Sequence, residues 1–324
     1  MRGNMLTVSA GAVAAFFYVA LFLPVGIGSV LWPFTAIPLY LVALSRPASD
    51  NLLALAGAGF FITFLGVLGV LAPGGGQLLI GFLLTMALPA VVAGLYYRTL
   101  AEADSAPKGE LLIAIYVMLS LGVFFITAAG FALAGTALHT MFLETAMPIA
   151  QALMEHLQTM DIPQEGVTAE AIARDISRQM AAFVPLFFIL LHSASLLIAR
   201  WLLGRRQIPT PPAPKLVPLR FSIKISFLFF GALSVYTYLL KTSPENTLIF
   251  YLSPLLAALA FPLAAQGLAF VYGKLIKRLV KGLRYGVYIV LLFTFLLAPI
   301  FTSFIFVMVG MANQLFANNE IKTK

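Results

Sequence analysis

The sequence predicts an all-α fold, a polytopic bundle of transmembrane helices. Of its 324 residues, 61% are hydrophobic and only 10% are charged, and the mean hydropathy is +0.99. A soluble domain has about 45–50% apolar and about 25% charged residues, so this composition excludes an ordinary soluble protein. Apolar runs long enough to cross a bilayer recur along the whole chain.

Seven apolar runs each have the length of one span, because a helix needs about 20 apolar residues to cross about 30 Å of hydrocarbon. They are residues 52–71, 78–97, 111–133, 183–203, 221–240, 247–272 and 287–311. A single helix over residues 6–44 would reach about 58 Å, too far for one crossing. Pro24, Gly26 and Gly28 interrupt this stretch and favour a turn. We therefore expect two spans there and about nine in all, or eight if 6–44 is one re-entrant element.

The distribution of charge predicts a cytoplasmic N-terminus. With nine alternating spans and that orientation, 15 of the 20 Lys and Arg residues lie inside and eight of the twelve Asp and Glu residues lie outside. Cytoplasmic loops carry such an excess of Lys and Arg. The first apolar stretch runs on to Leu44, so we expect an uncleaved segment rather than a signal peptide. The expected location is a bacterial inner membrane.

Composition divides the chain into two bundles and a linker. We expect a six-span N-terminal bundle over 1–204, a proline-rich cytoplasmic linker over 205–219 and a three-span C-terminal bundle over 220–324. The long outer loop 135–182 holds two expected helices, 141–160 and 169–180, with Thr168 as the N-cap of the second. This hairpin is expected to lie on the outer membrane surface. The alternative is a lid over an outward-facing pocket.

One segment of the C-terminal bundle combines basic and apolar residues at helical spacing. We expect an interfacial helix over 274–284 that contacts anionic lipid, with a cytoplasmic partner as the alternative. Its basic residues are Lys274, Lys277, Arg278, Lys281 and Arg284. Nucleic-acid binding is not expected, because membrane topology accounts for most of the net charge of +8.

The sequence holds no motif for catalysis or for a cofactor. HExxH, a glycine-rich phosphate loop and GxSxG are absent, as is Cys. The expected spans contain no Asp or Glu, which argues against a proton relay. His139 and His156 lie near Glu144 and Glu155, but their spacing matches no metal-ligand motif. We therefore expect no enzyme, cofactor or metal, and an intramembrane enzyme is the weakest hypothesis.

The few polar groups within the expected spans are the candidate solute contacts. His192 lies in the sixth span and Gln266 in the eighth. Each is interpreted either as bonded to a neighbouring helix or as contacting a ligand. Trp32, Pro33 and Pro38 lie in the second span, where prolines interrupt helices. Transporters use interrupted helices to form mid-membrane sites, and simple packing kinks are the alternative.

Several short motifs resemble the YybS-like family of bacterial polytopic membrane proteins. They are Ser9-Ala-Gly-Ala-Val-Ala-Ala, Leu23-Pro-Val-Gly-Ile-Gly, Trp32-Pro-Phe-Thr-Ala-Ile-Pro and the glycine-rich third span. That family is similar to the substrate-binding subunits of energy-coupling-factor transporters, in which Ala-x-x-x-Ala on the first helix packs against a coupling subunit. Ala10 and Ala14 have this spacing, so the resemblance implies an energising or coupling partner there. Those subunits have six spans, which would correspond to the first six here.

Two hypotheses for function follow. The first is a substrate-recognising component of small-molecule transport, with a site near Trp32, Pro33, Pro38 and His192 beneath the loop 135–182. Its solute would be small and uncharged or zwitterionic. The second is a non-transporting scaffold that recruits a cytoplasmic or membrane partner through 274–284 and the proline-rich linker. The first requires a polar cavity within the membrane, and the second a solid interior.

Overall fold

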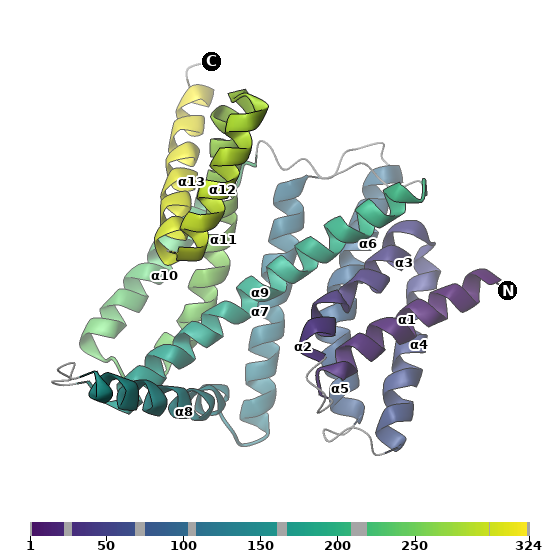
Figure 1. Cartoon of the computed structure of the whole chain (residues 1–324), viewed down its shortest axis with the longest axis horizontal. Helices are drawn as coiled ribbons and strands as arrows, with labels where there is room; N and C mark the ends of the chain where they lie inside the picture. The colour runs from purple at the N-terminus through teal and green to yellow at the C-terminus, as the bar shows by residue number, and fades with distance from the viewer. Residues whose placement is uncertain are drawn as a thin grey trace. The chain divides into compact units, whose positions relative to one another are not determined.

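The computed structural model describes residues 2–22, 28–68, 75–102, 108–160, 167–208, 219–297 and 299–322. In these ranges the chain is helical and contains no β-sheet, which confirms the all-α fold class. The helices form two units. Unit 1 comprises 1–108 and 188–214, and unit 2 comprises 109–187 and 215–324. Helix α9 (Ala169–Arg205) contributes its first half to unit 2 and its second half to unit 1 (Figure 1).

Unit 1 contains the N-terminal helices. They are α1 (Arg2–Ala20), α2 (Gly28–Leu31), the 3-10 helix η1 (Trp32–Phe34), α3 (Ala36–Ser45), α4 (Ala48–Val67), α5 (Gly75–Phe82), the π-helical turn η2 (Leu83–Ala87) and α6 (Leu88–Glu102). Glycines bring α1 and α4 into backbone contact. A Cβ on Gly11 would lie 1.8 Å from the Ala54 carbonyl oxygen, and one on Gly57 2.4 Å from that of Val8. Such close approach is what small residues allow between apolar helices.

Unit 2 contains a C-terminal bundle with one helix lying across its end. Its other helices are α7 (Gly109–Leu133), α8 (Leu138–Thr159), α10 (Ile223–Thr242), α11 (Leu248–Lys274), the 3-10 helix η3 (Ile276–Arg278), α12 (Lys281–Leu297) and α13 (Pro299–Lys322). Within this unit α8 runs across the direction of α7 (Figure 1). α11 and α13 approach as closely as α1 and α4, since a Cβ on Gly267 would lie 2.0 Å from the Phe306 carbonyl oxygen.

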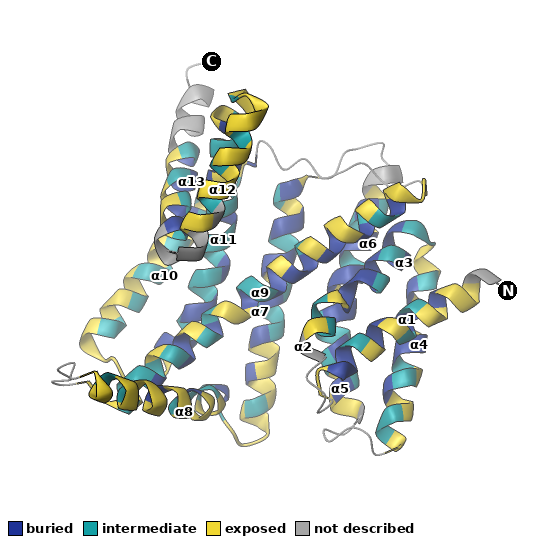
Figure 2. Ribbon diagram, viewed as in Figure 1, coloured by how far each residue is buried: buried dark blue, intermediate teal, exposed yellow. Residues whose placement is uncertain are grey.

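Within the described ranges, six helices are long and apolar enough to cross a bilayer, and they indicate a membrane protein. They are Ala48–Val67, Gly76–Thr99, Gly109–Leu133, Ala169–Arg205, Ile223–Thr242 and Leu248–Arg278. These six coincide with the expected spans three to eight. The least buried of them is α10: 6% of its apolar window is buried, and Figure 2 colours most of the helix exposed or intermediate, as expected of a helix whose side chains face lipid.

The described residues do not support a total of eight or nine spans. The apolar parts of the first two expected spans are short helices, Asn4–Ala20 and Trp32–Ser45. α3 has 10 residues and rises about 15 Å, half the thickness of the hydrocarbon. The expected ninth span, 287–311, is divided because α12 ends at Leu297 and α13 begins at Pro299. Proline has no N–H to continue a preceding helix and is favoured at the first helical position.

The expected basic helix over 274–284 is instead a bend. α11 ends at Lys274, η3 covers Ile276–Arg278, Leu279 is extended and α12 begins at Lys281. The basic residues therefore lie on a reversal between two helices rather than on one helix face. Two other expected features, the turn at Pro24 and Gly26 and residues 209–218 of the proline-rich linker, lie outside the described residues.

Candidate functional site

His192 on α9 lies at the centre of a buried polar contact in unit 1. Its side chain is fully buried, and both ring nitrogens are bonded. Nε2 lies 2.8 Å from the Thr85 carbonyl oxygen, and Nδ1 lies 3.2 Å from the Tyr40 hydroxyl. The Phe188 ring packs against the imidazole with a centroid separation of 4.5 Å. Three elements, α3, η2 and α9, therefore meet at one imidazole.

The bond to Thr85 follows from a proline in the same helix. Thr85 precedes Pro89 by four residues, and proline has no N–H with which to make the usual helical bond to that carbonyl. The helix here forms a π turn, in which the Leu88 N–H bonds to the Leu83 carbonyl. A carbonyl freed inside an apolar bundle needs another donor, and His192 Nε2 supplies it.

The partners of His192 define which tautomer its neutral imidazole adopts. A carbonyl oxygen only accepts, so Nε2 carries the hydrogen, and Nδ1 of the neutral imidazole accepts from the Tyr40 hydroxyl. This is the helix-bonding alternative for His192. Neither Tyr40 nor Thr85 was predicted as a partner, although Pro89 four residues after Thr85 was a signal that identifies the carbonyl.

The predicted helix break at Trp32 and Pro33 is also in unit 1. η1 ends at Phe34 and α3 begins at Ala36, with Thr35 between them. Trp32, Pro33 and Pro38 are half-buried. Thr35 is fully buried, and its hydroxyl makes no hydrogen bond to any residue in the described ranges. Buried hydroxyls are nearly always bonded, so this hydroxyl is an exception among the described residues.

Gln266 belongs to unit 2, where its amide joins three helices. Its Oε1 accepts from the Phe221 N–H just before α10 at 3.0 Å and from Gln314 Nε2 at 3.2 Å. Its Nε2 donates to the Gly310 carbonyl at 3.3 Å. Gln314 Oε1 also accepts from the Ser226 hydroxyl at 2.6 Å. These contacts have the helix-bonding role that was one alternative for Gln266, and they place it in a different unit from the other predicted solute contacts.

The predicted partner contact on α1 is mainly used inside unit 1. Ala14 is fully buried and Ala10 is half-buried. The helix that carries them packs against α4 through Gly11 and Gly57. Their small side chains therefore serve packing within the unit, whether or not a coupling subunit contacts α1.

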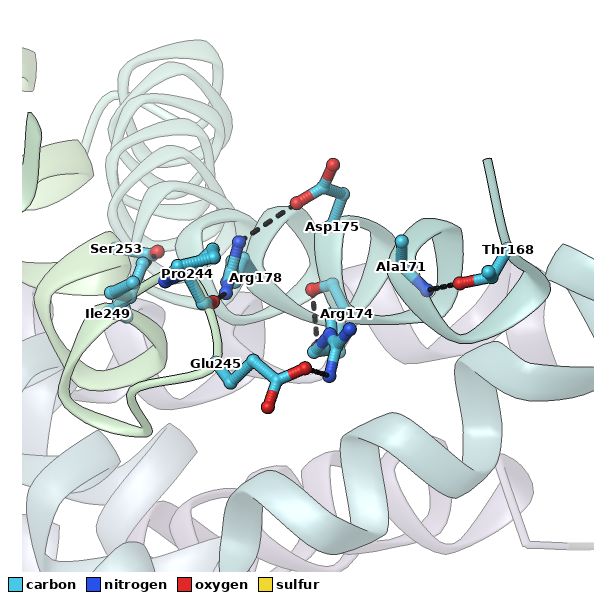
Figure 3. A network of polar contacts seen from close by, with 10 residues as sticks. Thr168, Ala171, Arg174, Asp175, Arg178, Pro244, Glu245, Ile249 and Ser253 are labelled. Atoms are coloured by element: carbon cyan, nitrogen blue, oxygen red, sulfur yellow. Dashed lines mark hydrogen bonds and ion pairs between the residues drawn. The ribbon is translucent and has the colours of Figure 1, made fainter. Parts of the chain in front are cut away.

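The expected outer hairpin, formed by α8 and the start of α9, is held to the turn between α10 and α11 by arginines (Figure 3). Arg174 Nη1 donates to Glu245 Oε1 at 3.0 Å, and Arg178 donates to the Pro244 carbonyl and to Asp175. Pro244 and Glu245 lie in the turn between α10 and α11. Thr168 caps α9 as predicted, since its hydroxyl accepts from the Ala171 N–H at 3.2 Å.

The α8 side of the hairpin is anchored by apolar contacts. Ala146 and Ala150 pack on Ala173 of α9, and Leu138 joins an aromatic cluster with Phe124 and Phe250. Much of α8 is exposed (Figure 2), and its exposed residues include Ile149 and Leu153, with Met160 exposed just beyond its end. An apolar arc on a helix that lies across the bundle end is typical of an interfacial helix. The surface hairpin and the lid both stay predictions.

The described residues form no metal-binding group of three or more His, Asp or Glu side chains. His139 instead packs near the rings of Phe250 and Tyr251, with centroid separations of 6.3 and 6.5 Å. No family model, curated protein or solved structure matches this chain. Any function must therefore be argued from the residues themselves.

Proposed function

We propose that this chain is an integral membrane protein and a substrate-recognising component of small-molecule transport, with its site in unit 1. The observation that carries the proposal is the polar cluster of His192 and Tyr40 in an apolar bundle that also contains two interrupted helices. An ionisable side chain within a membrane-spanning helix is costly and is therefore a functional-site hypothesis in its own right. Interrupted helices are also where transporters form their sites.

The chemistry of this region supports a small uncharged or zwitterionic solute. The polar groups of this region are the Thr35 hydroxyl and the hydrogen-bonded pair of the Tyr40 hydroxyl and the His192 imidazole, and none of them needs a formal charge to form hydrogen bonds. The wider proposal includes a cytoplasmic N-terminus and a bacterial inner membrane. Energy would come from a partner subunit, because the sequence has no nucleotide-binding motif.

The test is the thermal stability of the purified protein against vitamins, nucleobases, amino acids and lipid precursors. A solute at 100 times its dissociation constant stabilises the folded state by about 2.7 kcal/mol. We expect one chemical class to raise the melting temperature. A panel without any shift contradicts the proposal.

Thr35→Val provides the discriminating variant, because it removes the hydroxyl with little change in volume. In a purely structural role this change does not lower stability, since the hydroxyl bonds no described residue. In the proposed site it reduces the solute-dependent shift and leaves the melting temperature of the solute-free protein unchanged. A full shift in the Thr35→Val protein places the solute elsewhere.

A second candidate, a non-transporting scaffold, is favoured by a different observation. Both nitrogens of His192 and both amide atoms of Gln266 are bonded to protein groups, as in a bundle whose polar residues only hold helices together. This candidate predicts no shift with any solute and co-purification of a membrane or cytoplasmic partner after cross-linking. The solute panel therefore separates the two functions.

A further inference from the structure

The bend between α11 and α12 is bridged by hydrogen bonds from one arginine. Arg284 Nη2 donates to the carbonyls of Lys277 and Leu279 at 2.9 and 3.0 Å, and Ile276 is buried beneath the turn. Carbonyls after the last turn of a helix lack partners within the helix, and a nearby arginine satisfies them. Arg284 is thus used inside the bend, where it links the start of α12 to the turn that precedes it.

The other four cations of the bend are exposed and form no ion pair with any residue in the described ranges. Lys274, Lys277, Arg278 and Lys281 are all exposed. The ion pairs formed among the described residues lie at Arg174 and Arg178, and no Asp or Glu occurs in the sequence between Glu245 and Glu320. Four neighbouring positive charges repel one another and attract a polyvalent or clustered anion.

Large apolar side chains are exposed among these cations. Leu275, Leu283 and Tyr285 are more than 60% exposed, and Val280 is 81% exposed. A soluble anion would bind the cations but leave the apolar side chains exposed to water. The boundary between head groups and acyl chains suits both kinds of side chain, because the apolar ones enter the boundary while Lys and Arg extend toward the phosphates.

We propose that this bend, defined by Lys274, Lys277, Arg278 and Lys281, is a binding site for anionic phospholipid head groups at the membrane interface. The inference is independent of the proposed transport function, because it requires only that unit 2 lies in a bilayer. A cation near an anionic membrane surface strengthens binding about fivefold. The bend sits at the end of α11, one of the candidate spans, so bound lipid would hold that end at the interface.

The experiment compares lipid binding by the purified full chain in neutral detergent, measured by native mass spectrometry with short-chain phosphatidylglycerol and phosphatidylcholine. We expect the wild type to bind phosphatidylglycerol at least tenfold more tightly than phosphatidylcholine, with the preference decreasing as salt is added. The combined variant K274Q/K277Q/R278Q/K281Q loses this preference. Lys241→Gln, which removes one exposed cation at the far end of α10, is the matched control and keeps it.

Three results would overturn the proposal. One is an unchanged preference in the combined variant, and another is an equal loss in Lys241→Gln. The third is displacement of the lipid by millimolar inorganic phosphate, which would identify a site for a free anion. If the combined variant does not fold, Lys277→Gln and Arg278→Gln are measured singly, and each is expected to weaken phosphatidylglycerol binding about fivefold.

Discussion

One backbone carbonyl links Pro89 to His192. Pro89 deprives the Thr85 carbonyl of its helical donor, the π turn adjusts the backbone, and the imidazole of His192 completes the bonding. Tyr40 then bonds the second nitrogen. His192 looks isolated in the sequence, but it is one member of a chain of hydrogen bonds from Tyr40 to the Thr85 carbonyl.

Tyr40→Phe tests this chain against a matched residue in the same unit. It removes the donor to His192 Nδ1, and we expect a loss of about 1 kcal/mol in unfolding free energy, because a buried nitrogen is left without its partner. Tyr97 is equally buried, and its hydroxyl bonds no described residue. Tyr97→Phe should therefore change stability by much less. Denaturant unfolding in detergent measures both, and equal losses would contradict the assignment.

Helix pairs in both units depend on backbone contact at glycine. Gly267 and Gly310 face each other across α11 and α13, and between α1 and α4 Gly11 faces Ala54 and Gly57 faces Val8. In an apolar solvent helices gain little from burying apolar side chains, so close van der Waals packing determines which faces meet. The hydrogen bonds of Gln266 lie beside the Gly267 contact. Backbone packing and hydrogen bonding therefore both join α11 to α13.

Gly267→Ala should weaken unit 2. The added Cβ would lie 2.0 Å from the Phe306 carbonyl oxygen, so α11 and α13 must separate, and overpacking of this kind costs about 1–3 kcal/mol. Gly231→Ala on α10 is the control, because its Cβ meets nothing within 4 Å and alanine favours a helix. Thermal melting in detergent should show a loss for the first variant and none for the second. A melting temperature unchanged by Gly267→Ala would contradict a close contact between α11 and α13 at this glycine.

At the scale of the whole molecule, the order of the helices along the chain differs from their division into the two units. Each unit draws on two separate stretches of sequence, and α9 contributes to both. The outer hairpin and the basic bend are separated along the chain by three candidate spans, α9, α10 and α11. An odd number of crossings between two segments puts them on opposite sides of the membrane, however many crossings precede them.

Single-cysteine labelling tests this arrangement directly, because the sequence contains no Cys. With a membrane-impermeant maleimide on intact spheroplasts, we expect Glu155→Cys to react at once and Lys277→Cys only after permeabilisation. The direction follows from the excess of Lys and Arg on the cytoplasmic side. Labelling of both positions from the same side would mean that one of the three helices does not cross. Labelling in the reverse order would invert the proposed orientation.

Much of the fold was predictable because local composition dictates it. The six long spans, the amphipathic α8 and the Thr168 cap follow from apolar length, helical spacing and side-chain chemistry within a few residues. The predictions failed at two places where a helix ends within a continuous sequence pattern. Pro299 begins a new helix within an apolar run, and a bend after Lys274 interrupts a helical pattern of basic residues.

The sequence by itself determined that the chain is a helical membrane protein without catalytic motifs, because solvent transfer and helix length depend on composition alone. Only the tertiary structure decided the role of each buried polar group. His192 meets Thr85 and Tyr40, and Gln266 meets Gln314 and Gly310, through contacts between segments far apart in the chain. Hydrogen bonds depend on position within a few tenths of an ångström, and sequence spacing does not specify such positions across helices.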